Sequence, residues 1–451
     1  MTVAARRQTS PKDPMQLTRL SSAARPTSSG LAGAALVAAL CMATLSAQAQ
    51  APAPYTGETD PIKAGLMQGY PLAAGRQVSL QNWLGFPHNR WAFRNMQALF
   101  PTGAIPRGDG GVRALVKSRA LNVETLSFKD ADGHTTTVGD YFKREHIDGF
   151  IVMHKGFIVY EGYFSSMKPT DQHLWQSMTK SVTGLLAEML IHQGKLDANK
   201  PAGEYVPEIA DTVWGKATVR ELLNMAVAAK EPSTRAAELP ADFWSQANFL
   251  QSLKDPAVTQ DGSNGRLFYY TNSAPQAVGL VMTKVTGKAW HQLAHEMIWS
   301  KLGVEREAHI WLDRDGQAAA AGGLSTTLRD AARFAEMLRN DGRFNSQQIV
   351  PKAVIASLRS SNAANPPANT SQGNVAMVKL RPEMSYKSYW YQANDGVGST
   401  EFLGIFGQHL LINQAEQLSI VQFGSYTGPG PNALNWTGAM KAITAAIAKR
   451  P

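Results

Sequence analysis

The stretch Ser177-Met178-Thr179-Lys180 opens a predicted helix and places a hydroxyl and an amine in its first turn. Residues three apart on a helix lie on one face, so Ser177 and Lys180 would place a hydroxyl beside an amine. A serine hydroxyl is a weak nucleophile at neutral pH unless a neighbouring base takes its proton. Burial lowers the pKa of a lysine, which can then act as that base. The pair therefore predicts a nucleophilic site, provided that the amine is neutral.

The same pattern occurs a second time, at Ser165-Ser166-Met167-Lys168. About one or two copies are expected by chance in a chain of this size. A turn signature, Pro169-Thr170-Asp171, follows the second copy, so its serine and lysine are not expected to share a helix face. Apolar residues instead recur at helical spacing behind Ser177, until Gly194. They are Val182, Leu185, Leu186, Met189 and Leu190.

The first 49 residues are predicted to be a signal peptide and not part of the fold. They carry five basic residues, an apolar stretch over residues 31–45 and the cleavage motif Ala47-Gln48-Ala49. The apolar stretch is short for a membrane span. Cleavage after Ala49 would remove Cys41, the single cysteine, and leave a chain without disulfides. We expect a periplasmic or secreted protein, by the general or the twin-arginine route, with no stable membrane insertion after cleavage.

The composition excludes some classes of function. The net charge is +9, but the leader accounts for about four of these charges, and no lysine- or arginine-rich run follows it. Nucleic-acid binding is therefore not expected. His291 and His295 lie four apart on a predicted helix, a spacing that can place two imidazoles on one face as metal ligands, but no third ligand accompanies them. We expect no metal and no cofactor, and the oligomeric state stays open.

The remaining chain, long enough for a large core, divides into an extension and two lobes. Residues 50–125 are predicted to wrap the fold as an extension. An α/β lobe is predicted over 126–176 and 346–451, and a mainly helical lobe over 177–345. A hairpin is predicted at 150–160, strands at 401–413 and 418–424, and helices at 219–225, 274–285, 290–299, 327–340 and 434–449. The fold class is thus α+β, with an antiparallel sheet that both termini complete and that helices flank.

A second motif supplies the proton carrier that a serine–lysine pair requires. Tyr270-Thr271-Asn272 is the single Tyr-x-Asn of the chain and precedes a predicted helix. A tyrosinate stabilised by a nearby lysine cation can act as a general base. Asn272 can donate to a substrate carbonyl or hold Lys180. The alternative for an isolated Tyr-x-Asn is a buried tyrosine with a satisfied hydroxyl.

Taken together, the motifs resemble the serine hydrolases related to class C β-lactamases and penicillin-binding carboxypeptidases, nearest the branch of 6-aminohexanoate-dimer (nylon-oligomer) hydrolase and similar esterases. The resemblance covers roughly residues 145–445. It is carried by residues 176–184, 218–225, 270–272, 322–327 and 404–408.

This resemblance implies a β-lactamase/transpeptidase-like fold and a serine hydrolase that works through an acyl-enzyme. Ser177 would be the nucleophile, and Lys180 its base or electrostatic partner. Tyr270 would pass the proton to the leaving group, and Asn272 would support Lys180 or the substrate. The oxyanion hole would consist of the backbone N–H groups of Ser177 and of Ile405, which follows Gly404.

One departure from that family narrows the expected substrate. β-Lactamases and D-Ala carboxypeptidases carry Lys-Thr-Gly in the third motif, whereas this chain reads Phe402-Leu403-Gly404 or, one register on, Ile405-Phe406-Gly407. Without this cation, small neutral amides or esters are expected as substrates in preference to β-lactams or D-Ala peptides, whose carboxylate the cation helps to bind. Five aromatic residues can line an apolar pocket or belong to the core: Trp175, Trp244, Tyr269, Trp390 and Tyr391.

Two alternatives stay open. The chain can be a D,D-peptidase or β-lactamase that acts on cell-wall-like substrates, or a non-catalytic penicillin-binding-like sensor. The complete set of Ser177, Lys180 and Tyr270 argues against the sensor, because a binding protein does not need all three.

Overall fold

The computed structural model describes residues 57–230, 248–360, 384–395, 397–430 and 433–450. The predicted signal peptide and Trp244 lie outside these ranges. No helix within them is long and apolar enough to cross a membrane.

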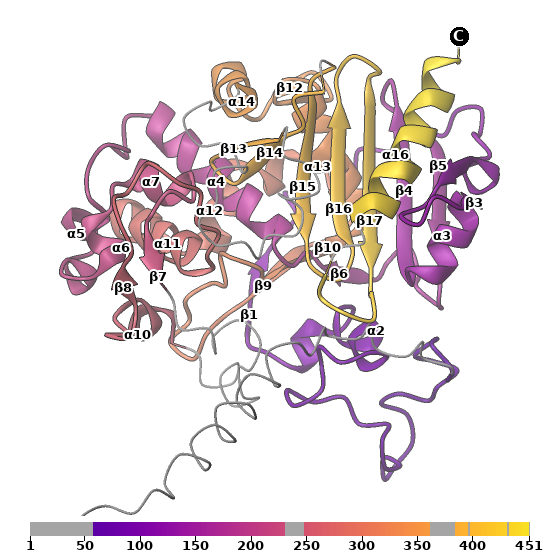
Figure 1. Cartoon of the computed structure of the whole chain (residues 1–451), viewed down its shortest axis with the longest axis horizontal. Coiled ribbons are helices and arrows are strands. Elements are labelled where there is room, and N and C mark those ends of the chain that lie inside the picture. The colour runs from indigo at the N-terminus through magenta and orange to yellow at the C-terminus, as the bar shows by residue number, and fades with distance from the viewer. Residues whose placement is uncertain (1–56, 231–247, 361–383, 396, 431–432, 451) are drawn as a thin grey trace, which may run out of the picture. The chain divides into compact units, whose positions relative to one another are not determined.

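The larger sheet has seven strands in the spatial order β13-β14-β15-β16-β17-β4-β5, and all neighbouring strands are antiparallel (Figure 1). The strands are β4 (Ile147–His154), β5 (Phe157–Tyr163), β13 (Ser385–Lys387), β14 (Trp390–Gln392), β15 (Ser399–Gly404), β16 (Gln408–Asn413) and β17 (Leu418–Gly424). Strand β17, from the C-terminal part of the chain, pairs with β4, which precedes the helical region. The predicted antiparallel sheet, completed from both ends of the fold, is confirmed.

Helices cover both faces of this sheet (Figure 1). They are α13 (Leu328–Arg339) and α4 (Met178–His192) on one face, and α3 (Val138–Arg144) and α16 (Ala433–Ala448) on the other. Side chains of a strand alternate between the two faces. Ile151 and Met153 of β4 therefore enter the core with α4 and α13, while Phe150 and Val152 enter the core with α3 and α16.

The predicted hairpin between β4 and β5 is confirmed. Lys155 and Gly156 form its turn, and both have positive φ angles, 51° and 85°. A two-residue hairpin with both central residues in that region matches the right-handed twist of the strands. The glycine is therefore required by the backbone conformation of the turn.

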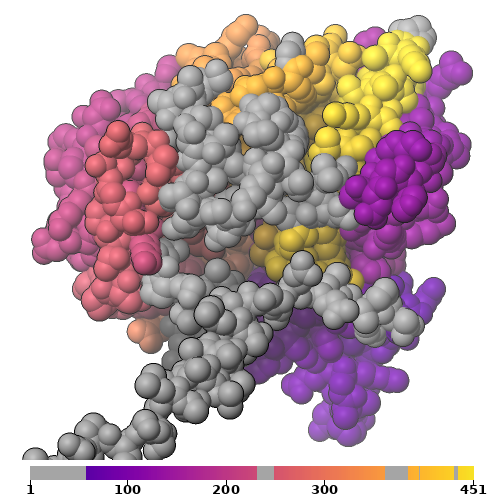
Figure 2. Space-filling model, in the orientation of Figure 1, coloured from indigo at the N-terminus to yellow at the C-terminus, as the bar shows by residue number. Residues whose placement is uncertain are grey.

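Most of the remaining helices gather beside the sheet, in the part coloured magenta to red in Figures 1 and 2. They are α5 (Ala202–Tyr205), α6 (Val213–Lys216), α7 (Val219–Leu223), α10 (Phe249–Leu253), α11 (Ser273–Thr286) and α12 (Trp290–Met297). Helix α7 ends two residues earlier than predicted, because Asn224 leaves the helical conformation and Met225 has a φ of 53°. Helix α14 (Lys352–Arg359) packs on α4 and β14.

A second sheet, of four antiparallel strands, was not predicted. Its order is β1-β9-β10-β6, with β1 (Thr102–Ile105), β9 (Ala308–Trp311), β10 (Leu324–Thr327) and β6 (Gln172–Leu174). Strand β6 leads directly to the helix that carries Ser177, and β1 belongs to the N-terminal extension. The extension is thus hydrogen-bonded to a sheet that leads into the candidate site.

The smaller elements lie around these two sheets. They are α2 (His88–Ala92), the 3-10 turns Met96–Ala98, Val123–Thr125, Pro207–Ile209 and Trp299–Lys301, and the strand pairs β2 (Ser127–Lys129) with β3 (Thr135–Thr137), β7 (Ala229–Lys230) with β8 (Thr259–Gln260), and β11 (Arg343–Phe344) with β12 (Gln347–Gln348).

The prediction of one strand over residues 401–413 is wrong. The chain reverses within it, so that β15 ends at Gly404 and β16 begins at Gln408. Phe406 and Gly407 make this reversal with φ angles of 62° and 90°. Ile405, predicted on a strand edge, is therefore the first residue of a tight turn.

Candidate active site

Ser177 lies at the N-terminus of α4 and its hydroxyl is not used to cap the helix. It occupies the N-cap position with φ −63° and ψ −11°, and no capping hydrogen bond forms from its side chain. The residue before it, Gln176, has a φ of 47°, a conformation that costs free energy for a residue with a side chain. The backbone thus turns sharply into the helix and leaves the hydroxyl for other partners.

Lys180 is buried one turn further along α4, at 1% exposure. Its Nζ lies 2.9 Å from Ser177 Oγ, 2.8 Å from Asn272 Oδ1 and 2.8 Å from the carbonyl oxygen of Ala321. No carboxylate within the described ranges forms an ion pair with it. Burial without a counter-charge lowers the pKa of Lys180 to about 7.

The two oxygen partners of Lys180 fix the direction of its lone pair. A neutral amine has two N–H donors and one acceptor lone pair. Asn272 Oδ1 and the Ala321 carbonyl oxygen can only accept hydrogen bonds, so they take both donors. The lone pair then faces Ser177 Oγ, which is the arrangement that a base needs to remove the serine proton.

Tyr270 lies beside the same amine, which is 5.1 Å from the centre of its ring. Burial raises the pKa of Tyr270 to about 12, while a hydrogen bond with Ser177 acts in the opposite direction. The phenol is therefore protonated near neutral pH, when the amine of Lys180 is partly neutral. The two groups form an acid and a base on either side of one serine hydroxyl.

Tyr270 and Asn272 reach the serine because they directly precede α11. Asn272 is the N-cap residue of that helix, and its side chain makes no capping bond. Thr271 Oγ1 instead accepts from the N–H of Ala274. The amide oxygen of Asn272 is thereby left to accept from Lys180.

Gly404 allows the end of β15 to lie against the two residues that directly precede Ser177. A Cβ added at Gly404 would lie 2.6 Å from the carbonyl oxygen of Trp175 and 3.2 Å from Cβ of Gln176. Such a contact is too close for any residue except glycine. Ile405 follows directly and is 40% exposed. The residues predicted for the oxyanion hole thus lie at two neighbouring points of the backbone.

Sequence reasoning missed the backbone and amide groups that hold Lys180 from behind. The N–H of Ala321 donates to Gln276 Oε1 at 2.9 Å, and Gln276 Nε2 donates to the carbonyl oxygen of Ala318 at 3.2 Å. Gln276 lies one helical turn after Asn272 on α11. A backbone carbonyl acceptor has no residue signature, and the only nearby signal was the pair Gly322-Gly323.

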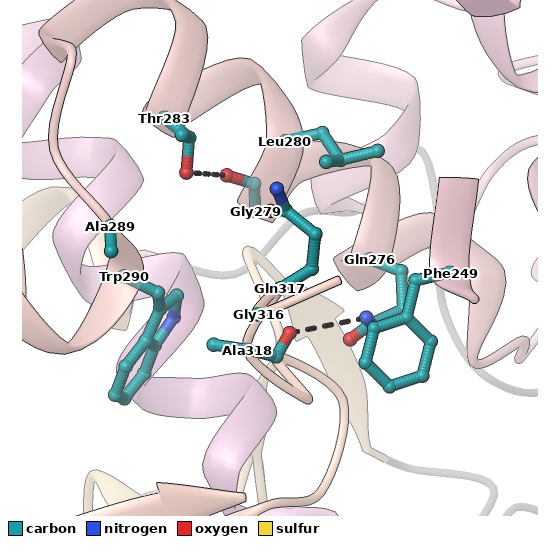
Figure 3. Close-up of a pocket in the computed structure, with 10 residues that line it drawn as sticks. All are labelled: Phe249, Gln276, Gly279, Leu280, Thr283, Ala289, Trp290, Gly316, Gln317 and Ala318. Atoms are coloured by element: carbon teal, nitrogen blue, oxygen red, sulfur yellow. Dashed lines mark hydrogen bonds between the residues drawn. The ribbon is translucent and has the colours of Figure 1, made fainter. Parts of the chain in front are cut away.

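A cavity of about 50 Å³ lies behind Gln276 and Ala318 (Figure 3). The hydrogen bond between these two residues is drawn there, and Trp290 and Gln317 lie on other parts of the wall. Ser177 is not among the residues that line it. A cavity of this size has room for a few water molecules, so it is not a substrate pocket.

The aromatic residues considered for a pocket pack mainly in the core. Trp175 donates to Thr326 Oγ1 and Trp390 to the Ser181 carbonyl oxygen, and both are fully buried. Tyr269 is 3% exposed and donates to the carbonyl oxygen of Asp261. Tyr391 is buried and packs edge-on against Tyr386.

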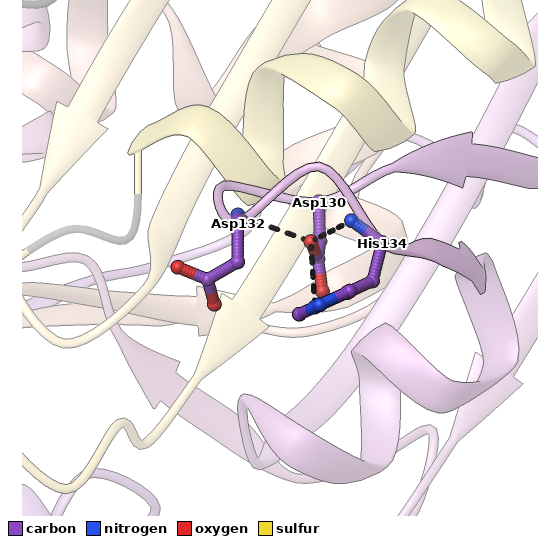
Figure 4. Close-up of side chains that lie close together, drawn as sticks. All are labelled: Asp130, Asp132 and His134. Carbon is purple, nitrogen blue, oxygen red and sulfur yellow. Dashed lines mark hydrogen bonds and ion pairs between the residues drawn. The ribbon is translucent and has the colours of Figure 1, made fainter.

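The two histidines that the sequence offers as metal ligands, His291 and His295, contact different parts of the chain. His295 Nδ1 lies 2.8 Å from the carbonyl oxygen of Pro106, and His291 packs against Gly103. Within the described ranges, the one group of three possible ligands is Asp130, Asp132 and His134 (Figure 4). Asp130 Oδ1 already accepts from the N–H groups of the other two, at 3.1 and 2.9 Å, as in an ordinary Asx turn.

Known proteins match this chain over most of its length. The family model described as Beta-lactamase matches residues 141–444. A 6-aminohexanoate-dimer hydrolase of Paenarthrobacter ureafaciens is 29% identical over 387 residues, which cover 83% of this chain and 94% of that protein.

Solved structures show the same fold. One from Bacillus anthracis, provisionally described as a 6-aminohexanoate-dimer hydrolase, has a TM-score of 0.75 at 24% identity over 84% of this chain and 100% of its own. EstCE1, a hydrolase with promiscuous acyltransferase activity, has a TM-score of 0.53 at 16% identity over 68% of this chain and 96% of its own. The fold predicted from the sequence motifs is confirmed by these matches.

Proposed function

The chain belongs to the β-lactamase family of hydrolases, and from that premise we propose that it cleaves small amides or esters through an acyl-enzyme on Ser177. The observation that carries the proposal is the environment of Lys180. Its buried amine has a pKa of about 7 and lies 2.8 Å from Asn272 Oδ1, 2.8 Å from the Ala321 carbonyl oxygen and 2.9 Å from Ser177 Oγ, so that the neutral amine can donate to the first two and accept the proton of the serine.

Acylation begins when Ser177 Oγ attacks the substrate carbonyl carbon and its proton passes to Lys180. The protonated phenol of Tyr270 then gives its proton to the departing amine or alkoxide as the bond to the acyl carbon breaks. This step leaves a lysine cation 5.1 Å from the ring centre of a tyrosinate. The two opposite charges stabilise each other in a buried site.

Deacylation restores both groups. The tyrosinate of Tyr270 takes a proton from water, and the resulting hydroxide attacks the acyl carbon. Ser177 Oγ leaves and recovers its proton from Lys180. Protons therefore balance over the cycle, and each group returns to its resting form without an external acid or base.

The negative oxygen formed in both steps needs hydrogen-bond donors. We assign this role to the backbone N–H groups of Ser177 and Ile405, because Gly404 lets the β15–β16 turn approach the start of α4 closely. Donors that are held in place before the reaction stabilise the developing charge without reorganisation.

The proposed substrate is a small amide or ester without net charge. A 6-aminohexanoate oligomer is one candidate, because its terminal ammonium and carboxylate cancel and the carboxylate lies at the end of a flexible chain. The relative from Paenarthrobacter ureafaciens carries that activity in its name. In either register of the third motif, Phe402-Leu403-Gly404 or Ile405-Phe406-Gly407, this chain has no lysine. A D,D-peptidase or β-lactamase activity would have to bind the substrate carboxylate without that cation.

We also propose that the protein acts outside the cytoplasm, because residues 1–49 have the organisation of a signal peptide. The measurement is the N-terminal sequence of protein recovered from the periplasm or medium. We expect it to begin at Gln50. Cytoplasmic protein that retains residues 1–49 would contradict the proposal.

The activity is tested with a panel of p-nitrophenyl esters, aminohexanoate oligomers, D-Ala peptides and a chromogenic β-lactam. Wild type is compared with Ser177→Ala and with Ser165→Ala, which alters the second Ser-x-x-Lys copy and serves as the matched control. We expect esters or oligomers to be cleaved by wild type and Ser165→Ala but not by Ser177→Ala. Equal turnover by Ser177→Ala would reject the mechanism. Turnover chiefly of the β-lactam or D-Ala peptides would replace the substrate class, and no turnover would favour a sensor.

A further inference from the structure

The segment of residues 89–94 lies outside the part of the chain that matches the family model, which begins at residue 141. It covers most of α2 and the two residues after it. Asn89, Arg90 and Phe93 are all buried, although they belong to the N-terminal extension. An extension that merely wraps the surface would not be expected to bury an amide and a guanidinium group.

Phe93 contacts the strand that leads into the nucleophile. Its carbonyl oxygen accepts from the N–H of Leu174 at 2.8 Å, and its ring lies edge-on to the ring of His173, with centroids 5.9 Å apart. Leu174 is the last residue of β6 and stands three positions before Ser177. The position of Phe93 therefore constrains the backbone that enters α4.

The same segment also contacts the turn that carries Ile405. The ring of Phe93 lies edge-on to that of Phe406, with centroids 5.4 Å apart. Asn89 Nδ2 donates to the carbonyl oxygen of Tyr426 at 3.0 Å, and the N–H of Tyr426 donates to the carbonyl oxygen of Phe406 at 3.2 Å. Phe406 has a φ of 62°, a conformation that persists only where the surroundings hold it.

A buried group of charges anchors the segment. Arg90 Nη2 lies 2.9 Å from Asp148 Oδ1, and Arg94 forms a second ion pair with the same carboxylate. The other oxygen of Asp148 accepts from Ser425 and lies 3.2 Å from His173 Nε2. Breaking a buried pair of this kind is strongly unfavourable, so the anchor is rigid.

These contacts join two parts of the fold that belong to different sheets. Strand β6 lies in the four-stranded sheet, while the turn after β15 connects two neighbouring strands, β15 and β16, of the seven-stranded sheet. On the proposed function, the N–H of Ser177 follows β6 and the N–H of Ile405 lies in that turn. Their separation decides how well both can reach one oxyanion.

We propose that residues 89–94, with Phe93 at the centre, set the separation of the two oxyanion donors. Phe93 is a positioning residue, since it packs on β6 and on Phe406 and does not take part in the reaction. The inference rests on the proposed function, because it presupposes acyl transfer at Ser177.

The test compares Phe93→Leu with Phe100→Leu. Phe100 is a matched control, because it is buried in the same cluster and shares Trp83 as a neighbour with Phe93, but its other ring contact is with Trp311 in place of His173 and Phe406. Four quantities are measured for each: kcat/KM on an ester, the affinity for a trifluoromethyl ketone transition-state analogue, the Kd of the ester in a Ser177→Ala background, and Tm. A defect in the oxyanion hole lowers kcat/KM and the affinity for the analogue together, and leaves the Kd of the ester unchanged.

We expect Phe93→Leu to lose about tenfold in kcat/KM and about the same factor in affinity for the analogue, with substrate Kd unchanged. Phe100→Leu should change Tm alone. Equal losses in both variants, or a loss of kcat/KM in Phe93→Leu with unchanged analogue affinity, would overturn the proposal.

If Phe93→Leu does not fold, Phe406→Leu tests the same contact from the other side and should give the same pattern. A wild type that turns over neither esters nor amides and does not bind the analogue would reject the proposed function itself, before any variant is compared. The two failures are thus distinguishable.

Discussion

Lys180 donates from Nζ to the carbonyl oxygen of Ala321 over 2.8 Å, in a part of the site that no side-chain motif marks. Together with Asn272 Oδ1, this carbonyl occupies the donors of the amine and directs its lone pair to Ser177. Ala321 is in turn held by Gln276, whose amide oxygen accepts from its N–H. The geometry of the base therefore depends on a residue that does not contact the serine.

Gln276→Leu should lower kcat about tenfold and change KM little, because the Ala321 carbonyl loses its support and the amine loses its fixed direction. Steady-state kinetics on an ester measure both constants. Gln317→Leu is the control, since Gln317 lines the same cavity and is not bonded through its side chain to Ala321 (Figure 3). A wild-type kcat in Gln276→Leu, or an equal loss in Gln317→Leu, would contradict this role.

The rate of acylation should rise with pH through about 7. Lys180 acts as a base only when unprotonated, and burial lowers its pKa to about 7, so the active form is populated above that pH. Below it, the rate should fall about tenfold per pH unit. Burial raises the pKa of Tyr270 to about 12, so no decline is expected before about pH 10. Single-turnover rates on an activated ester give the profile, and a flat profile from about pH 5 to 9 would speak against Lys180.

Gly404→Ala should lower kcat/KM by about a hundredfold, because the new Cβ would lie 2.6 Å from the Trp175 carbonyl oxygen and displace the turn of Ile405. The control is Gly428→Ala, where an added Cβ has nothing within 4 Å. Fluorophosphonate labelling rates report the change. If Gly404→Ala were labelled at the wild-type rate, the assignment of the Ile405 N–H to the oxyanion hole would be contradicted.

Asp148→Asn should destabilise the fold by roughly 3 kcal/mol or more at neutral pH, because Arg90 and Arg94 lose their buried counter-charge. Burial alone would favour the neutral acid, but Arg94 and Arg90 hold the pKa of Asp148 well below its usual range. The ionised form therefore stabilises the fold above the unfolded pKa of about 3.9, and this contribution is lost as the pH falls.

Urea unfolding of wild type and Asp148→Asn over a pH series measures this difference. The gap in free energy of unfolding should be constant above about pH 5 and should narrow below about pH 4. A gap that widens on acidification would contradict the ion-pair interpretation.

The helix of Ser177 and the hairpin that anchors the seven-stranded sheet were predictable because their patterns are local, whereas β13 and β14 were not predicted. Apolar residues at helical spacing marked α4, and two short apolar runs on either side of Lys155-Gly156 marked β4 and β5. The error at residues 401–413 has a physical reason. Phe406 takes a positive φ without being glycine, so the turn had no strong sequence signal.

The rest of the site depends on contacts between distant segments. The Ala321 carbonyl, 141 residues after Lys180, is a backbone group that any residue would provide. The contact of Phe93 with Phe406 joins the extension to the last strands, and the four-stranded sheet combines strands from three regions of the chain. Such contacts follow from tertiary packing and leave no periodic pattern in the sequence.

The most direct measurement is the mass of the intact protein during turnover of a slowly deacylated p-nitrophenyl ester. Wild type should gain the mass of one acyl group, and peptide mapping should place it on the peptide that contains Ser177. The Ser177→Ala protein should gain no mass and release no burst of nitrophenol. An adduct on another residue, or unchanged turnover in Ser177→Ala, would contradict the assignment of Ser177 as the nucleophile.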